Sequence, residues 1–378
     1  MISGAYPAAR RVSPRLHAHY ARHVPAAAEL ASRRVAAVPD EGSIEALITA
    51  GFWASLRREE GYLPKISLAF LAPEQSRRPL IFERPLSLDP DALAQIAPAV
   101  APAGIHLGVW PILGALQVWG TARTIPAYCF VLEVAAPGLL VIKHHGGEES
   151  GKFVNVAVLE GDEVKMIDEG ASRMPDCPEL LTSLLGFDSP GSWIESVNVL
   201  VQVAVSMRMH GRGGALLVVP AASEAWRESI VRPIRYALSP PFSALADLAH
   251  ELPEEYHQDW QQSLARAVDA VSGLTAVDGA TVLTDRYEVL AFGAKIARRD
   301  GCPQVEKVMV TEPIEGSEAA VVHPTELGGT RHLSAAQFVQ DQRDAVALVA
   351  SQDGGFTVFA WSPCEDMVHA HRVEVLLL

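Results

Sequence analysis

The run from Gly328 to Ala336 reads Gly-Gly-Thr-Arg-His-Leu-Ser-Ala-Ala, and its residue types can hold a phosphate group. Two glycines let the backbone approach a ligand closely, and the first amides of a helix attract an anion. Thr330 and Ser334 add hydroxyl groups. Arg331 offers a planar fork that suits phosphate oxygens, and His332 can donate to a further oxygen. A helix start with solvated side chains would share this local sequence, so the run alone leaves both interpretations open.

The tripeptide Asp278-Gly279-Ala280 lies about fifty residues upstream of that run. An aspartate beside a glycine can bind a divalent metal or draw a proton from a sugar hydroxyl, although Asp-Gly is also a common turn. The tripeptide follows a helix pattern and opens an apolar strand. We therefore expect Asp278 at a sheet edge, where α/β proteins place ligands.

Helices and strands that would position these residues follow from hydrophobic periodicity and from turn residues. The pattern predicts helices at Ser192 to His210, at Pro253 to Ser272 with Gly273 as its end, and from the glycine pair to about Asp341. It predicts strands at Ala215 to Val219, Thr281 to Leu283, Val289 to Phe292, Ala345 to Ala350 and Phe356 to Ala360, the last two joined by a hairpin at Gly354-Gly355. A long polar connection is expected from Ala297 to Leu327.

The N-terminal part has the pattern of an α+β domain. Helices are expected at Ile44 to Glu60 and at Pro90 to Ala97, where Asp89 suits the N-cap and Pro90 the first helical position. Short apolar runs predict strands at Ile66 to Leu71, Leu80 to Glu83, Ile105 to Trp110, Leu116 to Gly120, Phe130 to Glu133 and Leu139 to Lys143.

The first 35 residues are rich in arginine and alanine, as in organellar transit peptides. We expect the arginines to line a solvated face instead, and Pro7, Pro14 and Pro25 to break up any long amphipathic helix.

The bulk composition is that of a globular chain with ample core material, because 49% of the 378 residues are hydrophobic and 20% are charged. The net charge of -14 argues against sequence-independent binding to a nucleic acid polymer, which needs clustered cations. No apolar run approaches the ~18 residues of a membrane span. The four cysteines form no CxxC pair, which indicates reduced thiols and a cytoplasmic protein.

The C-terminal part, from about Gly213 to Trp361, resembles a diadenylate cyclase (DAC) domain. That family has a short apolar strand, an Asp-Gly-Ala motif after a helix, a Gly-Thr-Arg-His-Arg motif opening another helix, and a strand that ends in a Gly-Gly hairpin. The matching segments here are Gly214 to Val219, Asp278 to Ala280, Gly329 to Leu333 and Ala350 to Gly355.

The resemblance implies that two ATP molecules condense to cyclic di-AMP and two pyrophosphates at two sites facing each other in a homodimer or higher oligomer. It implies that Asp278 is catalytic and binds a divalent metal, Mg or Mn. It assigns ATP binding to Gly279, Ala280, Gly329, Thr330, Arg331, His332 and Ser334.

Two departures from the family pattern fall inside these motifs. Leu333 replaces the second arginine of Arg-His-Arg, and Lys295, Arg298, Arg299 or Arg343 would have to substitute for it. Gln352 stands where an acid is common, which leaves Asp353 as the nearest further metal ligand. The longer connection at 297–327 could form a lid or a dimer contact.

The N-terminal part is similar to the probable sensor domains called DACNV, through Phe52-Trp53, the charged run Leu56 to Gly61, Gly108 to Trp110 and Val118 to Gly120. Core packing is the ordinary role of such tryptophans. The resemblance implies that an unknown small ligand or protein binds this domain.

We therefore expect an α/β protein with a sensor-like α+β domain at 1–175, a linker and connecting helix at 176–212, and a DAC-like domain at 213–378. The C-terminal domain would have a central mixed sheet flanked by helices. Two alternatives stay open: a nucleotide-binding regulatory protein without turnover, and a cyclase that makes a different cyclic nucleotide.

Overall fold

The computed structural model describes residues 4–30, 35–58, 61–102, 104–145, 153–168, 170–171, 199–250 and 258–378. It is a mixed α/β protein with two compact units, one of Met1–Ile167 together with the last residue and one of Asp168–Leu377. The turn-rich segment expected at 170–191 and the predicted helix starts at Ser192 and Pro253 lie mostly or wholly outside the described residues.

The first unit is built on a mixed sheet with the strand order β2-β4-β3-β1-β5-β6-β7-β8 among the described residues. Only the pair β1 and β3 is parallel there. The strands are β1 (Ser67–Phe70), β2 (Leu80–Ser87), β3 (His106–Ile112), β4 (Ala115–Ala122), β5 (Phe130–Ala136), β6 (Leu139–His145), β7 (Phe153–Glu160) and β8 (Glu163–Met166). All six strands predicted for this part are confirmed; β7 and β8 lie beyond the predicted set.

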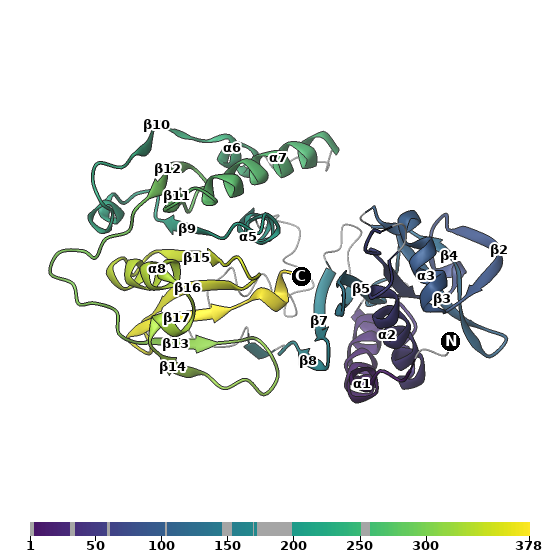
Figure 1. Ribbon diagram of the computed structural model, residues 1–378. Helices are drawn as coiled ribbons and strands as arrows, with labels where there is room; N and C mark the ends of the chain where they lie inside the picture. Colours follow the sequence, from purple (N-terminus) through teal and green to yellow (C-terminus); the bar gives the residue numbers. More distant parts are fainter. Residues whose placement is uncertain are drawn as a thin grey trace. The chain divides into compact units, whose positions relative to one another are not determined.

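The helices of the first unit are α1 (Pro7–Leu30), α2 (Glu41–Ser55) and α3 (Pro90–Ile96). They share one hydrophobic core with one face of the sheet, and α1 and α2 lie side by side (Figure 1). The predicted start of α3 is confirmed, because the Asp89 carboxylate accepts hydrogen bonds from the amides of Asp91 and Ala92. The helix that was expected to reach Glu60 is shorter in the structure, because α2 ends at Ser55 and Leu56 is its C-cap.

The expectation that prolines break up the N-terminal segment was wrong. The 24-residue helix α1 runs through Pro14 and Pro25, both of which face solvent. Its opposite side buries Val12, Leu16 and Tyr20 in the core. An interior proline costs about 3 kcal/mol, whereas each large side chain buried contributes roughly 1.5–3 kcal/mol, so the packing outweighs the prolines. The arginines at positions 10, 11, 15 and 22 are exposed, as predicted.

The second unit is built on a mixed sheet with the order β10-β12-β11-β9-β15-β16-β17-β13-β14 among the described residues. The parallel pairs are β9 with β11 and β13 with β17. The strands are β9 (Gly214–Val219), β10 (Tyr236–Phe242), β11 (Ala280–Thr284), β12 (Val289–Ala294), β13 (Val308–Thr311), β14 (Ala320–Val322), β15 (Val346–Ala350), β16 (Phe356–Ser362) and β17 (Met367–Arg372). All five predicted strands and the hairpin between β15 and β16 are confirmed.

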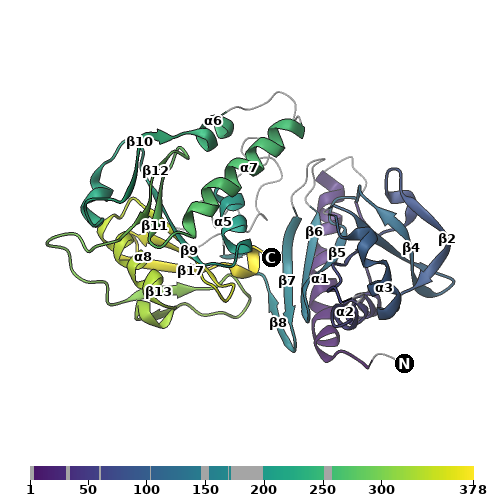
Figure 2. The ribbon, with the colours of Figure 1, turned by 45° about the horizontal axis from the view of Figure 1, so that its top comes forward.

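The helices of this unit are α5 (Val199–Met209), α6 (Ala244–His250), α7 (Gln258–Thr275) and α8 (Thr330–Asp341). Ala335, Phe338 and Val339 of α8 pack in one core with alternate residues of β9 and β15. Helices α5 and α7 contact each other, and both reach the central strands (Figure 2). Gly273 does not end α7, which continues to Thr275, where the Thr275 hydroxyl donates to the carbonyl of Ser272.

The segment expected as a long polar connection is largely part of the sheet. It contains β13, which pairs in parallel with β17, and β14, which pairs with β13. Val308 is fully buried in the same core as α8. The strands are four and three residues long, too short for a visible alternation of apolar and polar residues.

Candidate functional site

The sequence-predicted residues gather at one edge of the second sheet. Ala280 of β11 pairs with Ala294 of β12, and Gly214 of β9 pairs with Ala350 of β15. Asp278 thus precedes the start of β11, and Asp353 follows the end of β15. This edge lies at the amino ends of the parallel pair β9 and β11, whereas α/β proteins generally bind ligands at carboxyl ends.

Asp278 is exposed and pairs with a lysine. Its side chain is 90% exposed, and its Oδ2 atom lies 2.5 Å from Nζ of Lys295, which is itself 54% exposed. The antiparallel pairing of β11 and β12 explains this contact, because Lys295 comes directly after β12. The hydrogen bond and charge of Lys295, followed by the charge of Arg331, lower the pKa of Asp278. The carboxylate is therefore ionised at neutral pH.

Gly279 has a packing role that the sequence did not reveal. Its φ is +114°, a conformation that L side chains rarely adopt. A Cβ atom at this position would lie 2.5 Å from the carbonyl carbon of Gly293 in β12. The glycine thus allows β12 to approach the loop and bring Lys295 to Asp278. The side chain of Ala280, expected to approach a nucleotide, is instead packed in the core at 1% exposure.

The run from Gly328 to Ala336 forms the predicted helix start. Gly329 is the N-cap of α8, with no side chain capping the helix amides, and both Gly329 and Thr330 are exposed. Ser334 lies one turn further along and is half-buried. The first turn of α8 therefore presents backbone amides and the Thr330 hydroxyl toward solvent, as anion binding requires.

Arg331 connects the two motifs. Its charge lowers the pKa of Asp278, so the two side chains are within electrostatic reach although 53 residues separate them in the sequence. Its guanidinium lies over Gly213, where a Cβ atom would be 2.9 Å from Nη1. Gly213 directly precedes β9 and has a φ of +69°, a conformation that favours glycine. The absence of a side chain at this position leaves room for the Arg331 guanidinium.

His332 points inward. It is 5% exposed, and its ring lies against Gly328, where a Cβ atom would be 2.5 Å from Nδ1. Burial lowers the pKa of His332, with the charge of Asp353 acting in the opposite direction and those of Arg331 and Arg372 adding to the decrease. The imidazole is therefore neutral at neutral pH and can act as a hydrogen-bond donor or acceptor but not as a cation.

Asp353 lies in the hairpin that follows β15. Its Oδ1 atom accepts hydrogen bonds from the Ser351 hydroxyl and, at 3.4 Å, from the amide of Gly355. These bonds lower its pKa, and His332 is a further electrostatic neighbour. Gln352, beside it, donates to the carbonyl of Arg212 at 3.3 Å. In the part of the chain that the structure describes, no group of three or more His, Cys, Asp or Glu side chains could hold a metal ion.

Leu333 leaves the helix start without its second cation. The side chain is half-buried and packs against the core under α8. Of the four candidate substitutes, Lys295 contacts Asp278, whereas Arg299 pairs with Glu228 at 2.7 Å. Arg343 lies 3.7 Å from the ring centroid of Trp361 and pairs with Asp366, and Arg298 is near Asp341. The structure thus places Lys295, out of the four, at the candidate site.

The comparison with protein families concerns the first unit. Trp119 is fully buried there and donates from Nε1 to the carbonyl of Leu71 at 2.8 Å, which is a core-packing role. Residues 33–123 match the family model described as the probable sensor domain DACNV. The predicted DACNV resemblance is confirmed for this segment, which includes α2, α3 and β1 to β4.

The remaining comparisons identify neither a fold nor a function for the chain. No curated protein matches the chain. A solved structure of a hypothetical membrane spanning protein from Bacillus cereus matches at 13% identity over 51% of this chain and 70% of that chain. Its TM-score of 0.28 is too low to support an argument about the fold. In the present chain, no described helix is both long and apolar enough to cross a bilayer.

Proposed function

We propose that this protein is a diadenylate cyclase whose second unit condenses two ATP molecules and whose first unit regulates the reaction. Residues 33–123 match the probable sensor domain DACNV, a type of domain associated with such enzymes. The observation that carries the catalytic part is the position of the two motifs at one end of the sheet, where Lys295 pairs with Asp278 and the charge of Arg331 lowers the pKa of Asp278. In this proposal the helices α5, α7 and α8 and the mixed sheet form the DAC-like domain.

The binding role of each residue follows from its geometry. Amides of the first turn of α8, the Thr330 hydroxyl and the Arg331 guanidinium can bind phosphate oxygens. Neutral His332 positions this turn through its contact with Gly328. Gly279 holds the loop at β12, so that Asp278 and Lys295 stay together.

The donor set fits a divalent cation that the nucleotide helps to hold. Mg²⁺ is usually bound by one or two carboxylates together with phosphates and water, and Asp278 supplies one exposed carboxylate. Asp353 could supply another through Oδ2, because both of its hairpin bonds are accepted by Oδ1. A bound Mg²⁺ or Mn²⁺ would neutralise charge that develops on the phosphate groups.

The condensation forms one P–O bond and breaks one in each half-reaction. The 3′-hydroxyl of one ATP attacks the α-phosphorus of the other, pyrophosphate leaves, and the hydroxyl proton is released. One site holds one ATP, so two copies of the chain must face each other. Because its pKa is lowered, Asp278 is a weak base and is better suited to bind and orient than to retain the proton.

The direct test uses the full chain with ATP and Mg²⁺ or Mn²⁺, with products identified by mass spectrometry. We expect cyclic di-AMP and pyrophosphate, with a specific activity that rises with protein concentration because the reaction needs two copies. Saturable ATP binding without any cyclic product, under either metal, would support the regulatory alternative instead. Other cyclic products from mixed NTPs would support the alternative of a different base choice.

The second prediction concerns Lys295, the cation at the site that can replace the positive charge missing at Leu333. On nucleotide binding, the ammonium can exchange the Asp278 carboxylate for a phosphate oxygen. We expect Lys295→Met to weaken ATP binding about tenfold or more, as for a lost charge-assisted contact. Isothermal titration calorimetry with ATP measures this change, and Arg298→Met is a control at another exposed cation nearby in sequence. Equal ATP affinity of Lys295→Met and the unmodified protein would rule out a phosphate contact by Lys295.

The regulatory alternative has one observation in its favour. Leu333 supplies no charge and Lys295 already pairs with Asp278, so the site offers fewer cations to a triphosphate than the family motif would. A protein of this kind would bind ATP and give no product in the assay above.

A further inference from the structure

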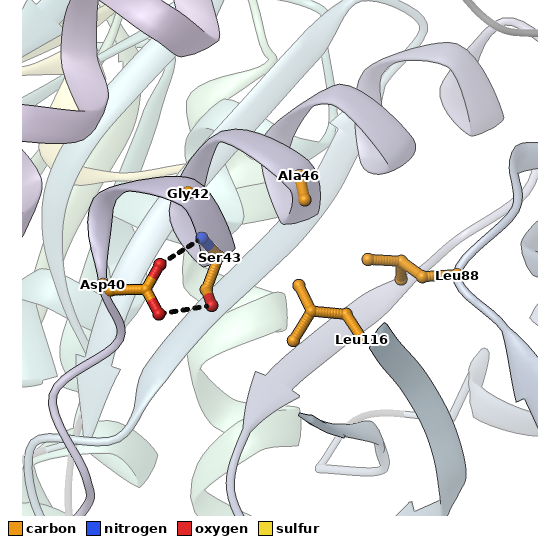
Figure 3. Close-up of a pocket in the computed structure, with 6 residues that line it drawn as sticks. All are labelled: Asp40, Gly42, Ser43, Ala46, Leu88 and Leu116. Atoms are coloured by element: carbon orange, nitrogen blue, oxygen red, sulfur yellow. Dashed lines mark hydrogen bonds between the residues drawn. The ribbon is translucent and has the colours of Figure 1, made fainter. Parts of the chain in front are cut away.

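An open pocket lies in the first unit, between the first turn of α2 and the strands β2 and β4 (Figure 3). Its volume is about 420 Å³, within the range of roughly 300–1,000 Å³ of small-molecule sites. It is lined by Asp40, Gly42, Ser43, Ala46, Leu88 and Leu116. All six residues fall within the segment 33–123 that matches the DACNV family, and none belongs to the candidate site around Asp278.

One wall of the pocket is apolar. Ser87 of β2 pairs with Gln117 of β4, and this antiparallel register places Leu88 beside Leu116. Both leucines are half-buried and pack against the core from one side. Figure 3 shows their side chains directed toward helix α2, where Ala46 faces them. The short side chain of Ala46 leaves the space between helix and strands open.

The other wall carries a carboxylate. Asp40 is the N-cap of α2, and its Oδ1 accepts from the amide of Ser43 at 2.8 Å while Oδ2 accepts from the Ser43 hydroxyl at 3.1 Å. A carboxylate has about four acceptor positions, so each oxygen can accept a further bond. Asp40 is exposed, and a Cβ at Gly42 would lie 3.3 Å from Oδ1, so the glycine keeps this oxygen accessible.

The negative charge of Asp40 in the pocket favours a cationic ligand over an anionic or neutral one. The six lining residues, all described in the structure, include one acid and no basic side chain. An anionic ligand would be repelled by Asp40, and a neutral ligand would lack a charge-assisted bond to it. An apolar body gains by covering the two leucines and Ala46.

From these two walls we infer that the pocket binds a small organic cation, a primary amine with an aliphatic body. The ammonium group donates to Asp40, and the aliphatic body lies between Ala46 and the pair Leu88 and Leu116. This assigns a ligand chemistry to the DACNV segment, and it does not depend on whether the second unit is a cyclase.

The test uses three probes of the same length and different charge. Hexylamine, 1-hexanol and hexanoate are titrated into the full chain at neutral pH by isothermal titration calorimetry. We expect saturable binding at one site for hexylamine and a Kd about tenfold or more higher for the alcohol and the acid. Equal affinity for hexanol, or no saturable binding of hexylamine, would overturn the assignment.

Two substitutions locate the bound amine. Asparagine caps helices as well as aspartate, so Asp40→Asn removes the charge and retains the N-cap of α2. We expect it to raise the Kd for hexylamine about tenfold or more. The matched control is Asp89→Asn, at the corresponding N-cap of α3 outside the pocket, which should leave the Kd unchanged.

Ala46→Phe should also abolish hexylamine binding, because the ring fills the space between helix and leucines. Unchanged affinity in Asp40→Asn, or an equal loss in Asp89→Asn, would contradict the proposed contact. Circular dichroism and the melting temperature of each variant show that the unit remains folded. The two variants locate the binding in the first unit, so this test fails or succeeds separately from the cyclase assay.

Discussion

For the proposed cyclase activity, we expect Asp278→Asn to lower the rate of cyclic di-AMP formation by about 10²–10³-fold, the range found when one electrostatic contact to the reacting centre is removed. The amide is nearly the same size as the carboxylate but has no charge to offer a metal ion. The melting temperature should not change, because the side chain is 90% exposed and its ion pair with Lys295 lies at the surface. The rate is measured by quantifying cyclic di-AMP, and the melting temperature by calorimetry.

The matched control for this prediction is Asp366→Asn. Asp366 is also an exposed aspartate of the second unit, with 83% of its side chain exposed, and it also pairs with a cation, Arg343. We expect its substitution to leave the rate unchanged. If Asp278→Asn retained the full rate, Asp278 would have no direct part in the reaction.

Acid destabilises the second unit through His371, which is buried at 2% exposure. Burial, and to a lesser degree the charge of His369, lowers the pKa of His371 from 6.5 to about 4. Its Nδ1 atom lies 2.7 Å from the Thr311 hydroxyl on the neighbouring strand. Between these two pH values the unfolded chain binds a proton that the folded protein does not. The stabilisation is therefore complete above pH 6.5 and is lost as the pH falls toward 4.

The size of this effect follows from the difference of about 2.5 between the two pKa values. At 1.36 kcal/mol per pH unit, the free energy of unfolding falls by about 3 kcal/mol from this residue. Urea unfolding between pH 8 and pH 4 measures it. In His371→Asn, which can retain the bond to Thr311, the decrease should be smaller by that amount. An identical pH dependence in the variant and the unmodified protein would show that His371 titrates normally.

The sequence correctly predicted those helices and strands that are determined by residues within them or directly beside them. Asp89 and Pro90 marked the start of α3 because a cap and a fixed φ act within one turn. The apolar run at 215–219 became the central strand β9, in which every residue is buried. The glycine pair before Thr330 marked the start of α8. In each case, the residues that determine the element lie within it or directly beside it.

The errors arose where distant packing outweighed local preference. α1 continues through two prolines because its opposite side is buried in the core. α7 passes Gly273, and the segment at 297–327 supplies two strands to the sheet. Neither strand has a pattern of its own, because pairing with β17 determines that β13 forms.

By itself the sequence determined the residue types available for chemistry and most of the helices and strands that carry them. It named Asp278, Arg331 and Lys295 as separate candidates, since residue type and motif order can be read along the chain. Only the tertiary structure brought these three together, through the pairing of β11 with β12 and the approach of α8 to Gly213. It also placed Ala280 in the core and packed Leu333 against it. Such contacts depend on strand register and helix packing, which join residues far apart in the chain and leave no local signal.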